Sequence, residues 1–328
     1  MKYLITGGTG FIGAAIAQRL VKDGHDVRVL DNNTRGSTRR LDGVADDVEL
    51  VVADIRDAAA VSNAIRGVDA VLHLAYINGT RFFYEQPELV LDVSVRGMLN
   101  VVDGCRQHGV GELYVASSSE VYQTPSVVPT PEAVPLVIPD PLNPRYSYGG
   151  GKILVELMAL NYGLTGFDKV VIFRPHNVYG PDMGWEHVLP QFVMRLKAAT
   201  ERQTVDPLPF PIQGSGHETR AFNFIDDFVD GMMTVIAHGQ HRTIYNIGTP
   251  EEHRILDVAT LTGAYFNRRL EIVPGKAPAG ATPRRSPDIR LLQSFGYRPK
   301  VPLSAGLPKL ADWYVEHASE APDSAFEF

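Results

Sequence analysis

Apolar residues in the first half of the chain alternate between short continuous runs and longer segments with helical spacing. Short runs that end in glycine or polar residues predict buried strands, and apolar positions that repeat every three or four residues predict amphipathic helices. The predicted strands span residues 3–6, 27–30, 48–53, 70–74, 113–116 and 170–173, and the predicted helices span residues 12–20, 58–65, 89–105 and 148–161. This alternation predicts an α/β fold with a doubly wound parallel sheet, covered by helices on both faces.

The pattern is looser in the second half of the chain. Residues 188–198 and 228–237 have helical spacing, and residues 244–247 form one more strand-like run. Residues 123–145 contain seven prolines, and we expect an ordered loop or lid there because a strongly patterned helix follows directly. Residues 205–216 are rich in proline and glycine, and no strand is predicted for them. The polar residues from Glu320 onward are expected to fray.

Composition disfavours several classes of protein. The formal net charge of −7 argues against a nucleic-acid-binding protein, which usually presents a basic face. The single cysteine, Cys105, allows no intrachain disulfide and is expected to be a buried structural thiol. His238 and His241 lack cysteine or carboxylate partners at ligand spacing, so no metal site is predicted. The chain begins with a strand and has no apolar run near the ~20 residues of a membrane span, which predicts a cytoplasmic protein without membrane association.

The first predicted strand leads into a glycine-rich turn. Gly7, Gly10 and Gly13 have the spacing G-x-x-G-x-x-G and stand between that strand and the next helix. Glycine lets the backbone approach a pyrophosphate closely, and the helix N-terminus offers free N–H groups and the positive end of its dipole. Asp31 ends the second strand, where a carboxylate hydrogen-bonds the ribose hydroxyls of a dinucleotide and repels a 2′-phosphate. These features predict a Rossmann-type site that prefers NAD to NADP, with basic Arg35 and Arg39 nearby as the contrary feature.

A second constellation lies at the start of the helix after the proline-rich segment. Tyr148 and Lys152 are four residues apart and therefore share one helix face. A neighbouring ammonium stabilises a phenolate and would make Tyr148 a usable base at neutral pH. Ser118 follows the strand 113–116, at the sheet edge where ligands bind in such folds, and would orient the same substrate hydroxyl. The glycines 149–151 each cost a helix roughly 1 kcal/mol relative to alanine, so we expect a cofactor or substrate to approach closely there.

With these segments the chain resembles the extended short-chain dehydrogenase/reductase family, and within it the nucleotide-sugar epimerases and dehydratases. The resemblance covers nearly the whole chain. Further matching segments are residues 54–55, 73–75, 117–122, 174–181, 220–227, 246–248, 287–289 and 295–297. Two positions depart from the family pattern. Ser94 stands where the family usually has asparagine, and three glycines follow Tyr148 in place of the commoner small and serine residues.

The resemblance implies a division of the chain and a set of roles. Residues 1–175, with 222–248 returning to them, would form the NAD-binding Rossmann domain, and residues 176–221 and 249–328 a smaller mixed α/β domain for the nucleotide sugar. The implied catalytic residues are Tyr148, Lys152, Ser118, Ser119 and Glu120. The implied cofactor-binding residues are Gly7, Gly10, Phe11, Ile12, Gly13, Asp31, Asn32, Asp54, Ile55, Leu74, Ala75, Tyr148, Lys152 and Pro175, with His176 also near the nicotinamide. The implied substrate-binding residues are Asn177, Val188, Arg220 and Arg285, the two arginines neutralising the diphosphate. The helices 89–105 and 148–161 would pair across a homodimer as a four-helix bundle.

The resemblance leaves several reactions open. Members first oxidise the bound sugar, commonly at C4, and differ in the step after this oxidation. Dehydratases and decarboxylases often have glutamate where Glu120 stands, but Ser119 replaces the aspartate typical of dTDP-sugar dehydratases, and residues 31–37 are similar to those of the epimerases. We favour an NAD-dependent nucleotide-sugar epimerase acting through a transient keto-sugar, with a 4,6-dehydratase or decarboxylase using Glu120 as the alternative. A simple alcohol dehydrogenase or reductase fits Arg220 and Arg285 less well, and a non-enzymatic NAD-binding protein would not need Tyr148 and Lys152.

Overall fold

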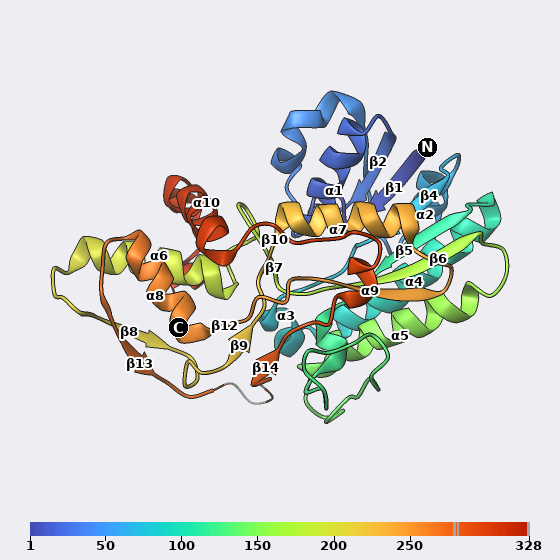
Figure 1. The fold of residues 1–328 in the computed structure, drawn as a ribbon. Coiled ribbons are helices and arrows are strands. Elements are labelled where there is room, and N and C mark those ends of the chain that lie inside the picture. Colours follow the sequence, from blue (N-terminus) through green and yellow to red (C-terminus); the bar gives the residue numbers. More distant parts are fainter. Residues whose placement is uncertain (278–279, 281, 327–328) are drawn as a thin grey trace.

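A seven-stranded parallel sheet forms the centre of the protein (Figure 1). The structure, a computed structural model, describes all residues except 278–279, 281 and 327–328. The strands are β1 (Lys2–Thr6), β2 (Asp26–Asp31), β3 (Val48–Val52), β4 (Ala70–His73), β5 (Glu112–Ala116), β6 (Lys169–Pro175) and β11 (Thr243–Ile247). Their spatial order is β11-β6-β5-β4-β1-β2-β3, and every neighbouring pair is parallel. The order reverses between β1 and β4, and ligands bind at this point in open α/β sheets.

Helices cover both faces of the sheet. One face packs against α1 (Phe11–Lys22) and α7 (Ile225–His238), and the other against α2 (Ala58–Ile65), α4 (Pro87–His108) and α5 (Tyr146–Tyr162) (Figure 1). Side chains alternate along a strand, so successive residues of β1 point to opposite faces of the sheet. Tyr3 and Ile5 are buried in the core under α1, and Leu4 is buried in the core under α4. Burial on both faces explains the continuous apolar runs, and the predicted Rossmann-type fold class is confirmed.

A second lobe, on the left of Figure 1, contains most of the chain after α5 that does not return to the sheet. Its helices are α6 (Val188–Arg202), α8 (Ile255–Tyr265) and α10 (Leu303–Glu316). Two parallel strands, β8 (Leu208–Ile212) and β13 (Leu270–Pro274), pair beside them, and a small sheet has the order β12 (His253–Arg254), β9 (Thr219–Arg220), β14 (Arg284–Arg285). Shorter elements are α3 (Thr80–Glu85), β7 (Val178–Tyr179), β10 (Asn223–Phe224) and α9 (Arg290–Gln293), with 3₁₀ turns at Thr38–Asp47, Ser119–Tyr122, Ala318–Glu320 and Asp323–Phe326.

The structure corrects two expectations in this lobe. The proline-rich segment 205–216 contains strand β8, in which exposed prolines alternate with buried Leu208, Phe210 and Ile212. Its single partner strand in the described sheet is β13, so the prolines remove no hydrogen bond from a second neighbour. The residues after Glu320 do not fray completely, because a 3₁₀ turn there buries Ala325 in the core beside α6.

Helix α4 carries the single cysteine. Cys105 is fully buried, as expected, and burial raises the pKa of its thiol to about 12. Among the described residues, no helix combines the length and the apolar character needed to cross a bilayer.

Candidate active site

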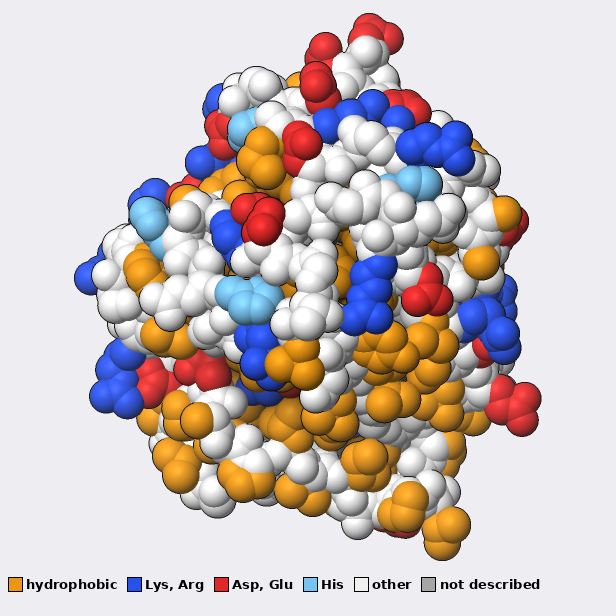
Figure 2. All heavy atoms as spheres, turned by 90° about the vertical axis from the view of Figure 1, so that its right-hand side faces the viewer, with side chains coloured by type: hydrophobic (Ala, Val, Ile, Leu, Met, Phe, Trp, Pro, Cys, Tyr) orange, Lys and Arg blue, Asp and Glu red, His pale blue; other side chains and the backbone are white. Residues whose placement is uncertain are grey.

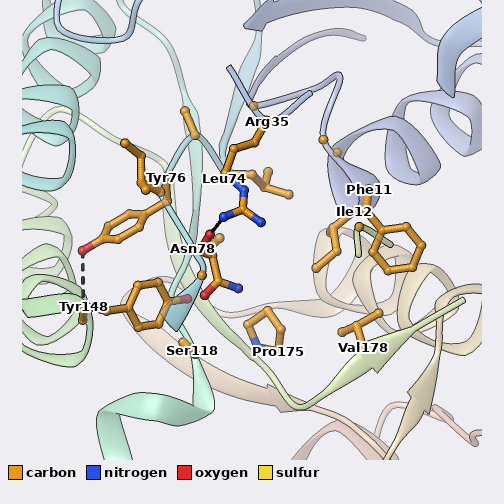
Figure 3. Close-up of a pocket in the computed structure, with 18 of the residues that line it drawn as sticks. Phe11, Ile12, Arg35, Leu74, Tyr76, Asn78, Ser118, Tyr148, Pro175 and Val178 are labelled. Atoms are coloured by element: carbon orange, nitrogen blue, oxygen red, sulfur yellow. Dashed lines mark hydrogen bonds between the residues drawn. The ribbon is translucent and has the colours of Figure 1, made fainter. Parts of the chain in front are cut away.

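A cavity of about 600 Å³ opens at the carboxyl ends of the sheet strands, between the sheet and the second lobe (Figure 3). Every candidate site residue from the sequence lines it except Arg220 and His176. These residues are Gly7, Gly10, Phe11, Ile12, Gly13, Asp31, Asn32, Asp54, Ile55, Leu74, Ala75, Ser118, Ser119, Glu120, Tyr148, Lys152, Pro175, Asn177, Val188 and Arg285. The sheet topology therefore brings together residues that are far apart in the sequence.

The turn between β1 and α1 is shaped for a close approach of phosphate. Gly7 has φ +73°, and a Cβ there would lie 2.7 Å from the backbone nitrogen of Ala75. A Cβ at Gly13 would collide with the carbonyl oxygen of Gly7, so the helix and the strand can pack this closely only with glycine. No side chain caps the N-terminus of α1. Its first N–H groups are thus available to the pyrophosphate of a dinucleotide.

Carboxylates border the cavity at the ends of the next two strands. The Asp31 side chain is fixed by two backbone N–H donors, those of Thr9 at 3.1 Å and Asn33 at 2.9 Å. The Asp54 carboxylate accepts a hydrogen bond from Asn32 Nδ2 at 3.1 Å, and the side chain of Arg56 holds the pKa of Asp54 down at about 2. Carboxylates fixed in this way can accept hydrogen bonds from the hydroxyls of an adenosine ribose and repel an added phosphate. These two residues therefore fit NAD.

Tyr148 and Lys152 are both buried at the start of α5. The Tyr148 ring stacks on Phe83, with the ring centres 4.8 Å apart. Burial lowers the pKa of Lys152 to about 7, with Glu156 acting in the opposite direction. The Lys152 ammonium donates to the carbonyl oxygen of Ala116 at 2.7 Å, so it lies on the sheet side of the cavity floor.

The expected lowering of the Tyr148 pKa is wrong for this structure. Burial raises that pKa to about 12, and the nearby Ser118 hydroxyl is the strongest of the groups that lower it. Lys152 is not among the groups that shift it most, because its ammonium is turned towards Ala116. The phenol is therefore protonated at neutral pH in this state, and any base role requires a bound substrate hydroxyl or cofactor to change its surroundings.

Arginine side chains gather around Glu120, close to Ser118. Arg285 donates to the Glu120 carboxylate at 2.6 Å. Burial raises the pKa of Glu120, but the positive charges of Arg285, Arg145 and Arg220 outweigh it and hold the pKa below its usual range. Arg220 lies behind the cavity wall, bonded to the carbonyl oxygen of Thr219 at 2.7 Å, and burial lowers its pKa to about 10. Arg220 thus contributes charge to the site without lining the cavity.

Tyr76 and His187 of the cavity wall were not recognised in the sequence, and Arg35 was noted there only as a basic residue near the NAD site. Arg35 reaches into the cavity, donates to the carbonyl oxygen of Asn78 and lies 5.3 Å from the centre of the Phe82 ring (Figure 3). Tyr76 and His187 also line it, and burial lowers the pKa of His187 to about 4. These residues lie in loops or just before a helix, where no periodic pattern or motif singles them out.

Two other segments expected at the site do not line the cavity. His176 does not line the cavity with Pro175; it is buried, and its Nε2 lies 3.0 Å from Asn246 Oδ1. The glycines 149–151 do not line it either. A Cβ at each would meet protein atoms instead, so packing against neighbouring side chains explains them.

Comparison with known proteins agrees with this geometry. The sequence model of the NAD dependent epimerase/dehydratase family matches residues 3–248 of the 328. The chain belongs to this family. The NAD-dependent epimerase/dehydratase family comprises extended short-chain dehydrogenase/reductase enzymes, as the resemblance indicated, and its cofactor is NAD.

The relatives of this family member carry out different reactions. UDP-N-acetyl-alpha-D-glucosaminuronate decarboxylase from Bacillus cytotoxicus is 30% identical over 325 residues, which are 95% of this chain and 97% of the relative. The UDP-glucose 4-epimerase of Thermus thermophilus in complex with NAD is 28% identical, with a TM-score of 0.81 and coverage of 96% of this chain and 99% of that one. The dTDP-glucose 4,6-dehydratase of Streptomyces venezuelae with NAD and TYD bound is 28% identical, with a TM-score of 0.86 and coverage of 99% and 100%. The chain is thus an enzyme of a family that includes epimerases, dehydratases and decarboxylases.

Proposed function

We propose that the protein is a nucleotide-sugar epimerase that oxidises the sugar at C4 and returns the hydride to the opposite face of the transient ketone. Bound NAD supplies the hydride acceptor and donor. The observation that carries the proposal is the placement of the Tyr148 phenol and the Ser118 hydroxyl in one cavity, while the neighbouring Glu120 carboxylate is committed to Arg285. Oxidation at a sugar hydroxyl needs a group that takes its proton and a second group that orients it.

Different residues of the cavity take the proton, orient the hydroxyl and bind the rest of the substrate. Tyr148 takes the proton of the C4 hydroxyl, and Ser118 holds the same oxygen by a hydrogen bond. The Lys152 ammonium, buried below them, favours the phenolate once the substrate hydroxyl is present. Arg285 and Asn177 bind the diphosphate, and Val188 borders the base; all three residues line the cavity.

Dehydration fits the site less well than epimerisation. A 4,6-dehydratase needs a base for the proton at C5 and an acid for the leaving hydroxyl at C6. The low pKa of Glu120 makes it a weak base, and Ser119 offers no acidic proton beside it.

Decarboxylation is the second candidate, and the arginine cluster favours it. Arg145, Arg220 and Arg285 surround the single carboxylate of Glu120, which leaves an excess of positive charge to bind a carboxylate on the sugar. Oxidation of a uronic acid at C4 produces a β-keto acid, which loses carbon dioxide without a base at C5. The decarboxylase relatives are consistent with this candidate.

The test is a panel of nucleotide sugars with the product followed by NMR. The panel contains UDP- and dTDP-linked glucose and galactose, and UDP-glucuronate. Interconversion of the C4 epimers supports the epimerase, and conversion of UDP-glucuronate to a pentose with release of carbon dioxide supports the decarboxylase instead. A stable 4-keto-6-deoxy product would overturn both.

Glu120→Gln provides a second test of the same proposal. An epimerase that uses Glu120 for no proton transfer keeps its turnover within about tenfold, because loss of a general acid or base costs about 10²–10⁴-fold. A loss of that larger size would place Glu120 in the chemistry and contradict the epimerase mechanism.

We also propose that two copies of the chain pair through α4 and α5. The two helices pack side by side and share a core, yet Leu91, Leu154 and Leu157 remain exposed on them. Figure 2 shows that hydrophobic side chains gather on the lower part of the face at the right-hand side of Figure 1, where these helices lie. Pairing of the two helices with their copies would bury these leucines in a four-helix bundle.

A further inference from the structure

Both departures from the family pattern meet at one side chain, Tyr76, in the loop after β4. A Cβ at Gly151 would collide with the Tyr76 hydroxyl oxygen and lie 3.0 Å from Ser94 Oγ. Ser94 on α4 is fully buried. Burial raises the pKa of the Tyr76 phenol, and the nearby Ser94 hydroxyl acts in the opposite direction. The residues at positions 94 and 151 are thus both small, and the Tyr76 phenol lies beside them between α4 and α5.

Tyr76 touches both residues that the proposed reaction depends on, and Figure 3 shows it beside Tyr148. The Lys152 Nζ lies 3.8 Å from the centre of the Tyr76 ring. The Tyr148 ring meets the Tyr76 ring edge-on, with the centres 5.2 Å apart and the planes at 85°. The Tyr76 hydroxyl also donates to the backbone carbonyl oxygen of Tyr148 at 3.5 Å. An aromatic face attracts a cation, and an edge-to-face pair fixes the relative orientation of two rings.

We propose that Tyr76 is a positioning residue that holds the Lys152 ammonium and the Tyr148 phenol in their working arrangement, and that Gly151 and Ser94 are small in order to admit it. The inference rests on the proposed function for the roles of Tyr148 and Lys152. The geometry itself depends only on contacts among these five residues.

The surroundings of Lys152 show why its charge needs such support. Its own helix provides Glu156, whose negative charge favours the ammonium but is shared with Arg174 at 2.6 Å. On β4, His73 faces Lys152; burial, and then the lysine charge, lower the pKa of His73 to about 3, so it stays neutral. The groups in direct contact that favour the ammonium are the Ala116 carbonyl oxygen and the Tyr76 ring face.

Removing the ring therefore lowers the pKa of Lys152 further below its ordinary value. A cation–π contact of a buried ammonium corresponds to a shift of about one pKa unit. The charged form exists below the pKa and is lost above it. An activity that needs the ammonium is then lost at lower pH, and the alkaline limb of the rate profile moves down by the same amount.

The first experiment compares Tyr76→Leu with Tyr76→Phe in the NAD-loaded enzyme. Lysine labelled with ¹³C at Cε reports the titration of Lys152, assigned by the signal missing in Lys152→Met. We expect the Lys152 midpoint and the alkaline limb of kcat to fall by about one pH unit in Tyr76→Leu, with KM for the sugar unchanged. Tyr76→Phe keeps the ring and should restore both values.

The outcomes of this experiment separate the inference from the proposed function. Wild-type titration of Lys152 in a folded, NAD-binding Tyr76→Leu variant would overturn the positioning role. Failure of the wild-type enzyme to act on any nucleotide sugar would overturn the proposed function, while the NMR titration would still decide the role of Tyr76.

The second experiment tests the fit between Gly151 and the Tyr76 hydroxyl. Gly151→Ala is made in the wild type and in Tyr76→Phe, which lacks the atom that the new methyl group would hit. We expect Gly151→Ala to lower kcat and the melting temperature in the wild type and to lower both much less in Tyr76→Phe, where the Ser94 hydroxyl at 3.0 Å still crowds the new methyl group. Gly150→Ala, whose Cβ would meet only the Ile138 side chain, is the matched control and should behave alike in both backgrounds. Equal losses from Gly151→Ala in the two backgrounds would overturn the pairing.

Discussion

The buried ion pair between Arg174 on β6 and Glu156 on α5 gives a quantitative stability prediction. The two residues are 1% and 3% exposed, and the guanidinium donates to the carboxylate at 2.7 Å through Nε and 2.6 Å through Nη2. Removing one partner of such a pair costs about 3–5 kcal/mol, because the remaining charge stays buried and uncompensated. We expect Glu156→Leu to lower the free energy of unfolding by that amount.

Urea unfolding followed by far-ultraviolet circular dichroism measures the loss. With a slope of about 3 kcal/mol per molar urea, the midpoint should fall by roughly 1 M or more. The double variant Arg174→Met with Glu156→Leu removes both charges of this pair, so it should regain part of the loss, although the Ser117 and Tyr122 hydroxyls lose a partner and the buried Lys152 ammonium loses a favourable negative charge.

An exposed ion pair provides the control for this prediction. Arg269 donates to Asp206 at 2.8 Å, and its side chain is 78% exposed, so Arg269→Ala should leave the midpoint unchanged. A wild-type midpoint for Glu156→Leu, or a double variant no more stable than the single one, would refute the reasoning.

Three further predictions concern the site, the core and the assembly. Tyr148→Phe should bind NAD normally in calorimetry but turn over about 10²–10⁴-fold more slowly, and wild-type turnover would contradict its role as the base. Cys105 should not react with Ellman's reagent in the native protein and should react in urea, because the thiol is buried with a raised pKa; rapid reaction of the native protein would show that α4 is packed differently. Leu157→Glu on α5 should convert a dimer to a monomer in light scattering, whereas Val52→Glu, similarly exposed on the edge strand β3, should not; an unchanged mass for Leu157→Glu would place the interface elsewhere.

The sheet could be predicted because its strands are buried on both faces. Continuous apolar runs locate β1 and β6 to within about two residues, and the helices between them follow from their periodicity. Periodicity failed where the second lobe uses short elements. Strand β8 alternates proline with apolar residues, and only its partner β13, over fifty residues away, makes that pattern a strand. The burial of Ala325 likewise depends on α6, which no local signal reveals.

The candidate site could be predicted where spacing carries chemistry. The glycines of the first turn have the spacing that lets a phosphate approach a helix N-terminus. Tyr148 and Lys152 are four residues apart, which places them on one helix face. The pKa values of the site residues and the net charge around them could not be predicted. The pKa of Tyr148 depends on its burial and on Ser118 from another element, and the excess positive charge around Glu120 depends on arginines from three parts of the chain.

The contact between Glu120 and Arg285 joins residues 165 positions apart. During synthesis on a ribosome, the glycine turn and the first strands emerge long before Arg285. The part of the sheet that carries the glycine turn can therefore fold before Arg285 is available at the sugar end of the site. A chain that ends between β11 and Arg285 would contain every strand of the central sheet but leave Glu120 without its partner, so the sugar end of the site would be incomplete.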